Sequence, residues 1–250
     1  MRFMKLAKVS SFALLVLVSR LNGESLPDMR PALVGSDRTA LVNLIDTQSL
    51  IKRGQGHGAI FLRCLVSPDG RTNYRLAYGG TPNTEILRQE VRQKLYNARF
   101  FPAVYHHQKT WAWFYGTVTF SVVDGKPHLR VYATQEQSEI LEGKDFISPQ
   151  SVYAPGHRYN QIHRMKDPFG PWSSEDVPGI VKFQMTVDRA GELKHIGVVE
   201  EIPPGKKYGE YALEDLKNFT WLPGFRNGQP TDSTTRLIYS FIPAGFGWKK

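Results

Sequence analysis

The chain has 250 residues, of which 41% are hydrophobic and 12% are aromatic, and this composition excludes an intrinsically disordered protein. The formal net charge is +9, which is compatible with an anionic partner such as nucleic acid, anionic lipid or cell-wall polymer. No run of like charges exceeds two residues. The basic excess is therefore more typical of a solvated surface than of a nucleic-acid site.

The N-terminal segment has the pattern of a secretory signal. Three positive charges lie in Met1–Lys8, the eleven residues of Val9–Ser19 are uncharged and mostly apolar, and Arg20 ends the run. Eleven residues are too few to span a bilayer, which needs about 20, but they fit the apolar region of a signal peptide. We therefore predict that residues 1–25 are a signal peptide and that the protein is exported, which argues against nucleic acid as a partner. A retained N-terminal membrane anchor is the alternative.

Residues 26–57 form an N-terminal lead-in. Within it, the segment 40–51 has the apolar content of a secondary-structure element. Its pattern does not decide between a strand and a helix.

Residues 58–134 are predicted to form a first module. Inward positions alternate along a strand, a turn follows, and a second apolar set has the spacing of one helical face. A final strand runs to Phe120, and the turn at Asp124-Gly125 predicts one further strand at 128–134. The strand positions are Ile60, Leu62, Cys64 and Val66, the turn is Pro68-Asp69-Gly70, and the helical positions are Leu87, Val91, Leu95 and Ala98.

Residues 135–178 connect this module to the next one. The segment is long for a loop without structure of its own. Its aromatic residues predict that it packs partly against both modules; they are Phe146, Tyr153, Tyr159, Phe169 and Trp172.

Residues 179–250 are predicted to form a second module of the same kind. A strand at 181–187 leads through the turn at Asp188–Gly191 into a returning strand at 193–199, and a helix then precedes a last strand that ends at Phe241. Proline ends the helix at Trp221-Leu222-Pro223, and Asn227-Gly228 marks a tight turn. The helical face consists of Tyr208, Ala212, Leu216 and Phe219.

A shift of 121 residues (179 − 58) superimposes the two modules without a gap. It places Gly58 on Gly179, Gly70 on Gly191, Pro102 on Pro223 and Phe120 on Phe241. The sequence therefore predicts an α+β protein with two repeated β-β-α-β modules, each a small antiparallel sheet with one helix packed on one face.

The order of these signals resembles the C-terminal domain of the TonB family. The second module carries it in GIVKFQMTVDRAG, ALEDLKNFTWLPGFRNGQP and TRLIYSF, and the first in GAIFLRCLVSPDG, LYNARFFPAVYHHQ and YGTVTFSV. The resemblance covers about half of the chain. The family's long proline-rich spacer is not present in the sequence.

The resemblance implies a binding protein of the Gram-negative cell envelope. TonB-like domains grip a short peptide of an outer-membrane transporter by adding it as a strand to the edge of their sheet, and they are not enzymes. We therefore expect an exported, periplasmic TonB-like protein that binds envelope partner peptides in connection with transport. The alternatives are a membrane-anchored energy transducer and a structural adaptor that binds peptidoglycan or an outer-membrane protein.

Side-chain chemistry offers no competing site in the sequence. Cys64 occupies a core position, His106-His107 falls in an exposed turn without a third zinc ligand at a suitable spacing, and Trp111 and Trp113 are more typical of packing than of an exposed platform. We expect no catalytic residue, no cofactor and no metal.

The remaining candidate is a backbone edge, because unpaired N–H and C=O groups can accept another strand. In the first module the extra strand at 128–134 would cover that edge, whereas the last strand of the second module has no successor. The predicted partner-binding edge strand is therefore Thr234, Thr235, Arg236, Leu237, Ile238, Tyr239, Ser240 and Phe241. Its expected partner is a protein or peptide of the envelope.

Overall fold

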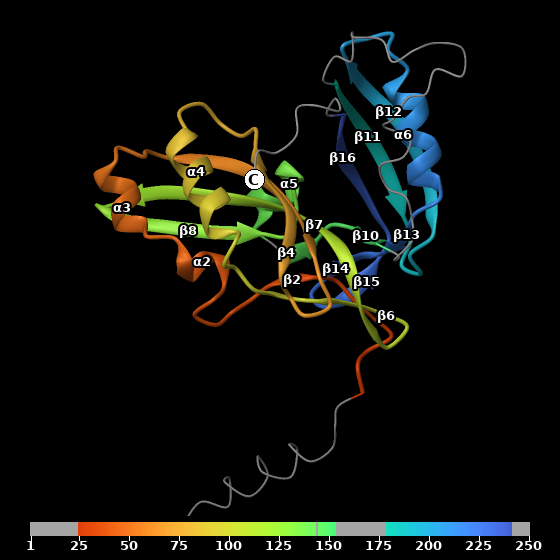
Figure 1. Cartoon of the computed structure of the whole chain (residues 1–250), viewed down its shortest axis with the longest axis horizontal. Helices are drawn as coiled ribbons and strands as arrows, with labels where there is room; N and C mark the ends of the chain where they lie inside the picture. Colours follow the sequence, from red (N-terminus) through yellow and green to blue (C-terminus); the bar gives the residue numbers. More distant parts are fainter. Residues whose placement is uncertain (1–24, 144, 154–178, 242–250) are drawn as a thin grey trace, which may run out of the picture.

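The computed structural model describes residues 25–143, 145–153 and 179–241, which form an α+β protein with mostly antiparallel sheets (Figure 1). Residues 1–24 of the predicted signal peptide and the connector residues Tyr159, Phe169 and Trp172 lie outside the described residues. Within the described residues, no helix is long and apolar enough to cross a membrane.

The first sheet has eight strands, and its centre is a four-stranded antiparallel set. β3 (Gly58–Val66) pairs with β4 (Thr72–Tyr78) on one side and with β7 (Gln108–Val123) on the other. β8 (Lys126–Tyr132) pairs with the far side of β7. The further strand expected after Asp124-Gly125 is therefore present, two residues earlier than expected at each end.

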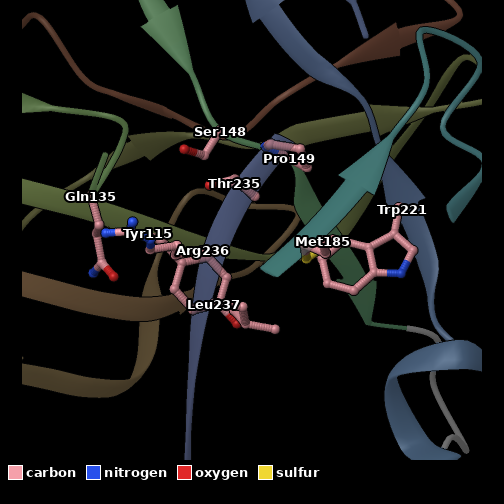
Figure 2. Close-up of a pocket in the computed structure, with 9 residues that line it drawn as sticks. All are labelled: Tyr115, Gln135, Ser148, Pro149, Met185, Trp221, Thr235, Arg236 and Leu237. Carbon is pink, nitrogen blue, oxygen red and sulfur yellow. The ribbon is translucent and has the colours of Figure 1, made fainter. Parts of the chain in front are cut away.

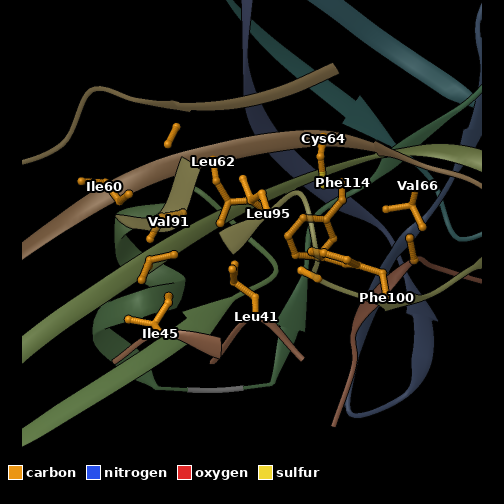
Figure 3. Packing of buried hydrophobic residues seen from close by; sticks show 14 of the residues in the cluster. Leu41, Ile45, Ile60, Leu62, Cys64, Val66, Val91, Leu95, Phe100 and Phe114 are labelled. Atoms are coloured by element: carbon orange, nitrogen blue, oxygen red, sulfur yellow. The ribbon is translucent and has the colours of Figure 1, made fainter. Parts of the chain in front are cut away.

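One face of β3 builds the main core with helix α4 (Glu85–Lys94). Figure 3 shows the predicted inward residues of β3 in this cluster together with Val91 and Leu95. Every second side chain of β3 turns to this face, and the helical residues recur every four positions, so both stripes are buried together.

Two short helices resolve the segment whose type the sequence left open. They are α2 (Leu41–Leu44) and α3 (Thr47–Lys52), and they contact β8. Asp46 caps α3, because its side chain accepts a hydrogen bond from the Ser49 backbone N–H at 2.9 Å. The buried residues Leu41 and Leu50 attach this lead-in to the main core.

The second sheet has three strands in the order β12-β11-β16. β11 (Gly179–Val187) lies between β12 (Leu193–Ile202) and β16 (Ser233–Phe241). Helix α6 (Tyr208–Lys217) packs on one face, where its apolar stripe joins the alternate residues of β11 in a separate core. The expected strand, helix and last strand thus lie within one or two residues of their predicted positions.

Residues 146–153 and 220–231 join the two sheets. β10 (Gln150–Tyr153) pairs with β7 on one side and with β13 (Thr220–Leu222) on the other, so a strand from beyond α6 belongs to the first sheet. Beside it, β14 (Gly224–Arg226) pairs with β9 (Phe146–Ile147) and with β15 (Gln229–Thr231). The expectation of a small sheet in the first module is therefore wrong: these non-local pairings enlarge it.

The segment after α4 pairs with the lead-in in the same way. β5 (Phe100–Phe101) pairs with β2 (Leu33–Val34), and β6 (Ala103–Tyr105) pairs with both β1 (Met29–Arg30) and β7. In the first half Leu33 lies opposite Phe101 and Met29 lies opposite Tyr105. In the second half Gln150 lies opposite Leu222 and Phe146 lies opposite Arg226, so the two sets of pairs are equivalent. The segment that follows each long helix, α4 or α6, thus pairs with a segment from earlier in the chain. We call these two sets of pairings clamps on the helix exits.

Gln150 connects the two clamps. The residue is 1% exposed. Its side chain bonds both backbone groups of Ala32: it accepts from the N–H at 2.7 Å and donates to the C=O at 2.9 Å. Its own backbone lies in β10, opposite Leu222. A buried amide is costly without hydrogen-bond partners, so these two hydrogen bonds hold the lead-in against β10.

Short helix α5 (Gln137–Glu142) precedes β9 and completes the described part of the connector. Its Glu139 accepts a hydrogen bond from Arg226 at 2.7 Å, and Arg226 lies over the ring of Phe146. The described connector residues therefore contact both the first sheet and the segment after α6.

Two glycines make the same close approach in the two halves of the chain. A Cβ atom on Gly70 would lie 2.3 Å from the carbonyl oxygen of Phe100, and one on Gly191 would lie 2.4 Å from that of Trp221. Both have positive φ, +78° and +84°. Only glycine fits these hairpin turns against the helix exits.

We expect Gly70→Ala and Gly191→Ala to destabilise the protein more than Gly125→Ala. All three place alanine at positive φ, but nothing lies within 4 Å of a Cβ on Gly125. The clash with a backbone carbonyl should lower the free energy of unfolding of the first two variants by about 1–3 kcal/mol more than in Gly125→Ala. Urea unfolding of the three variants measures this difference, and equal losses would contradict the close packing.

Candidate functional site

β16 is the end strand of the second sheet. All nine of its residues pair with β11, from Ser233 opposite Val187 to Phe241 opposite Gly179. Within the described residues no strand pairs with its other edge. Figure 1 shows β16 as the strand of this sheet that lies nearest to the first sheet. The predicted partner-binding residues 234–241 all fall in this strand.

The alternation of β16 gives its two faces different chemistry. Thr235 and Leu237 are buried on the side of α6, whereas Thr234 and Arg236 are exposed on the opposite face. On that face Thr234 makes a 2.9 Å hydrogen bond with Thr186 of β11. The strand is thus fastened by one buried face and by its ladder to β11.

One contact shows which backbone groups point away from β11. The Arg236 N–H donates a hydrogen bond to Oε1 of Glu136, outside the sheet. Because donors alternate in direction along an antiparallel strand, the N–H groups of Thr234, Ile238 and Ser240 also point outward. These groups form the edge that another strand could use.

Glu136 comes from the connector, and its carboxylate also accepts a hydrogen bond from Thr235 Oγ1 at 3.1 Å. Its neighbour Gln135 anchors to the first sheet: the Gln135 side chain donates to the Leu62 carbonyl at 3.1 Å and to the Tyr78 hydroxyl at 2.9 Å. Burial raises the pKa of Tyr78, which remains a neutral partner. The edge of β16 is therefore held at Arg236 by a segment fixed to the first sheet.

A small pocket lies at this junction. Figure 2 shows Gln135 and Tyr115 on one side of it, with Thr235, Arg236 and Leu237 of β16 alongside. Met185 and Trp221 close its far end. Residues of both sheets line the pocket, so it marks the place where β16 lies against the first sheet.

The corresponding strand of the first sheet, β7, has its second edge covered over part of the same stretch. β7 pairs with β3 from Ala112 to Phe120, and β8 covers its other side from Thr117 to Val123. Residues 117–120 therefore lie between two strands, whereas within the described residues 113–116 pair with β3 alone. The two halves of the chain thus differ: a further strand covers part of β7, whereas within the described residues none pairs with the outer edge of β16.

The opposite edge of the second sheet, β12, is exposed but irregular. Val199 is 58% exposed, and the register with β11 shifts at Lys182/Phe183 and again at Thr186/Val187. Such bulges blunt an edge against further pairing. We therefore place the candidate site on β16 rather than on β12.

The carboxylate pair at the end of β12 has structural partners. Glu200 pairs with Lys182, and the two oxygens of Glu201 accept from the backbone N–H groups of Lys206 at 2.8 Å and Gly209 at 3.0 Å. Glu201 thus serves the start of α6, a role that the sequence alone did not reveal. A glutamate placed shortly before a helix was its only sequence signal.

The histidine pair forms the turn between β6 and β7. His106 and His107 have φ of 49° and 60°, and the matching turn at Asn227-Gly228 has 50° and 76°. His106 Nδ1 lies 3.3 Å from Asp28 Oδ1, and His107 Nδ1 lies 2.7 Å from the Leu26 carbonyl oxygen. Among the described residues, no group of three or more His, Cys, Asp or Glu side chains is placed to hold a metal ion.

Trp111 and Trp113 are half-buried on the face of the first sheet that α4 does not cover. Trp111 meets Tyr153 edge-to-face with ring centroids 6.5 Å apart, and Trp113 lies 6.1 Å from Tyr74. Arg63 lies over Trp113. These contacts account for both tryptophans by packing.

Glu136 is the site residue that sequence reasoning missed. It lies 100 positions before Arg236, and a single glutamate in a polar connector carries no signal of its contact. Comparisons of this chain with protein-family models, with curated proteins and with solved structures found no match.

Cys64 is fully buried in the main core, and burial raises the pKa of its thiol well above the usual range. Because the thiolate is the reactive form, we expect no labelling of the native protein by a thiol reagent at pH 8. The same reagent should label one thiol per chain in concentrated guanidinium chloride. Rapid labelling of the native protein, followed by absorbance, would contradict a purely structural role.

Proposed function

We propose that this chain is an exported, non-enzymatic protein of the Gram-negative envelope that captures a partner peptide by β-strand addition to β16. The observation that carries the proposal is the asymmetry of the two sheets. β16 is a nine-residue end strand paired only with β11 in the described chain, whereas β7 is paired on both sides from Thr117 to Phe120.

The proposal includes the TonB-like repeat. Several paired features support it: the strand orders β4-β3-β7 and β12-β11-β16, the glycine contacts at Gly70 and Gly191, and the clamps on the two helix exits. Residues 29–34 and 146–151 make equivalent pairings at a spacing of 117 positions (146 − 29). On this proposal the repeat unit begins ahead of the first long strand.

In strand addition the backbone supplies the affinity and the side chains supply the selectivity. The outward N–H groups of Thr234, Ile238 and Ser240 would donate to carbonyl groups of the partner. Exposed Thr234 and Arg236 on one face, and Tyr239 on the other, would contact its side chains. The partner class is an extended peptide segment, and a segment of an outer-membrane transporter is the expected source.

We expect synthetic peptides copied from the periplasmic ends of outer-membrane transporters to shift the amide resonances of residues 234–241. The added strand changes the hydrogen bonding of these N–H groups, whereas in the segment 115–122 residues 117–120 already pair on both sides. Two-dimensional NMR of the labelled chain measures the shifts. Equal shifts in both segments, or none in 234–241, would refute the assignment.

Ile238→Pro gives a sharper test of the same edge. Proline removes an N–H that points away from β11, so the ladder to β11 should persist, while binding should fall about tenfold with the lost donor. Ile238→Thr keeps the N–H and is the matched control. Unchanged peptide affinity in Ile238→Pro, measured by calorimetry, would exclude this edge.

A further inference from the structure

The edge of β16 already has an occupant at one position. The Arg236 N–H donates to Glu136, and Thr235 Oγ1 donates to the same carboxylate oxygen. An N–H group has one proton to give. A partner carbonyl that pairs with Arg236 must therefore take the place of this carboxylate.

The first sheet holds Glu136 in that place. The Glu136 N–H donates to Thr134 Oγ1 at 3.1 Å, and the Thr134 hydroxyl lies 2.8 Å from that of Ser148. Thr117 of β7 donates to the Thr134 carbonyl oxygen at 2.7 Å. This buried network fixes the backbone of residue 136, so the carboxylate is presented to β16 at a set position.

The contact lies within the edge rather than at its end. The outward positions run Thr234, Arg236, Ile238 and Ser240, and Glu136 occupies the second of them. A strand that pairs along the whole edge must pass this point. A strand confined to Ile238 and Ser240 would gain only half of the outward donors.

We propose that Glu136 is an intramolecular competitor for strand addition: its carboxylate covers the Arg236 N–H until a partner strand displaces it. This inference rests on the proposed function, which it supplements with a regulatory contact. It also specifies the partner, because the displacing group is a backbone carbonyl of an extended peptide. The first sheet thereby limits the affinity of the second.

Hydrogen exchange of the free, full-length chain tests the contact without any ligand. We expect the Arg236 amide to exchange about tenfold faster in Glu136→Ala than in the unaltered protein, because a hydrogen bond is removed. Glu136→Gln keeps an acceptor and should lie between them. The Ile238 amide, which points the same way without a described acceptor, should not change.

Glu142→Gln is the matched control, since Glu142 is an exposed carboxylate at the other end of α5. It should leave the Arg236 amide unaltered. Equal exchange of that amide in all variants would overturn the inference. A native amide spectrum for β3 and β7 in each variant shows that the first sheet remains folded.

Calorimetry with the same synthetic transporter peptides tests the competition. Glu136→Ala should bind about three- to tenfold more tightly than the unaltered chain, as expected for removal of one competing hydrogen bond. Equal or weaker affinity would overturn the inference while leaving the proposed function in place. No binding by either protein would overturn the proposed function and the competition together, even if hydrogen exchange shows the contact.

Discussion

The arrangement of the two sheets depends on one short strand, β10, and on the buried amide of Gln150 within it. The backbone of β10 joins β7 to β13, and the Gln150 side chain bonds both backbone groups of Ala32. Loss of this residue would leave polar backbone groups unpaired in the interior. Lead-in, first sheet and the exit of α6 are therefore fixed by hydrogen bonds that converge on one place.

This junction decides which strand edges are available. Because β13 belongs to the first sheet, the short stretch from Leu222 to Ser233 brings β16 back along the first sheet, with its outer edge toward the connector. In the earlier half the chain turns at Asp124-Gly125 and covers β7 with β8. A similar series of elements thus leaves one last strand partly enclosed and the other at a sheet edge.

Local sequence signals predicted the elements better than their pairing. Alternation placed β3, β11 and β16, and glycine turns placed the hairpins, because these patterns act over a few residues. The type of 40–51 was undecidable, since α2 and α3 are too short to show a helical period. Trp221-Leu222 was recognised only as a helix stop, because its partner Gln150–Ser151 lies about 70 residues away.

The two edges of the second sheet illustrate two ways of managing unpaired backbone. The pairing of β12 with β11 contains register shifts, which are permanent features of the folded backbone. β16 keeps a regular ladder to β11 over its whole length and is covered at Arg236 by one side chain. A side chain can leave without unfolding a strand, so this protection is reversible. Aggregation and strand addition would draw on the same donors, so under the proposed function a removable carboxylate would limit the first while still permitting the second.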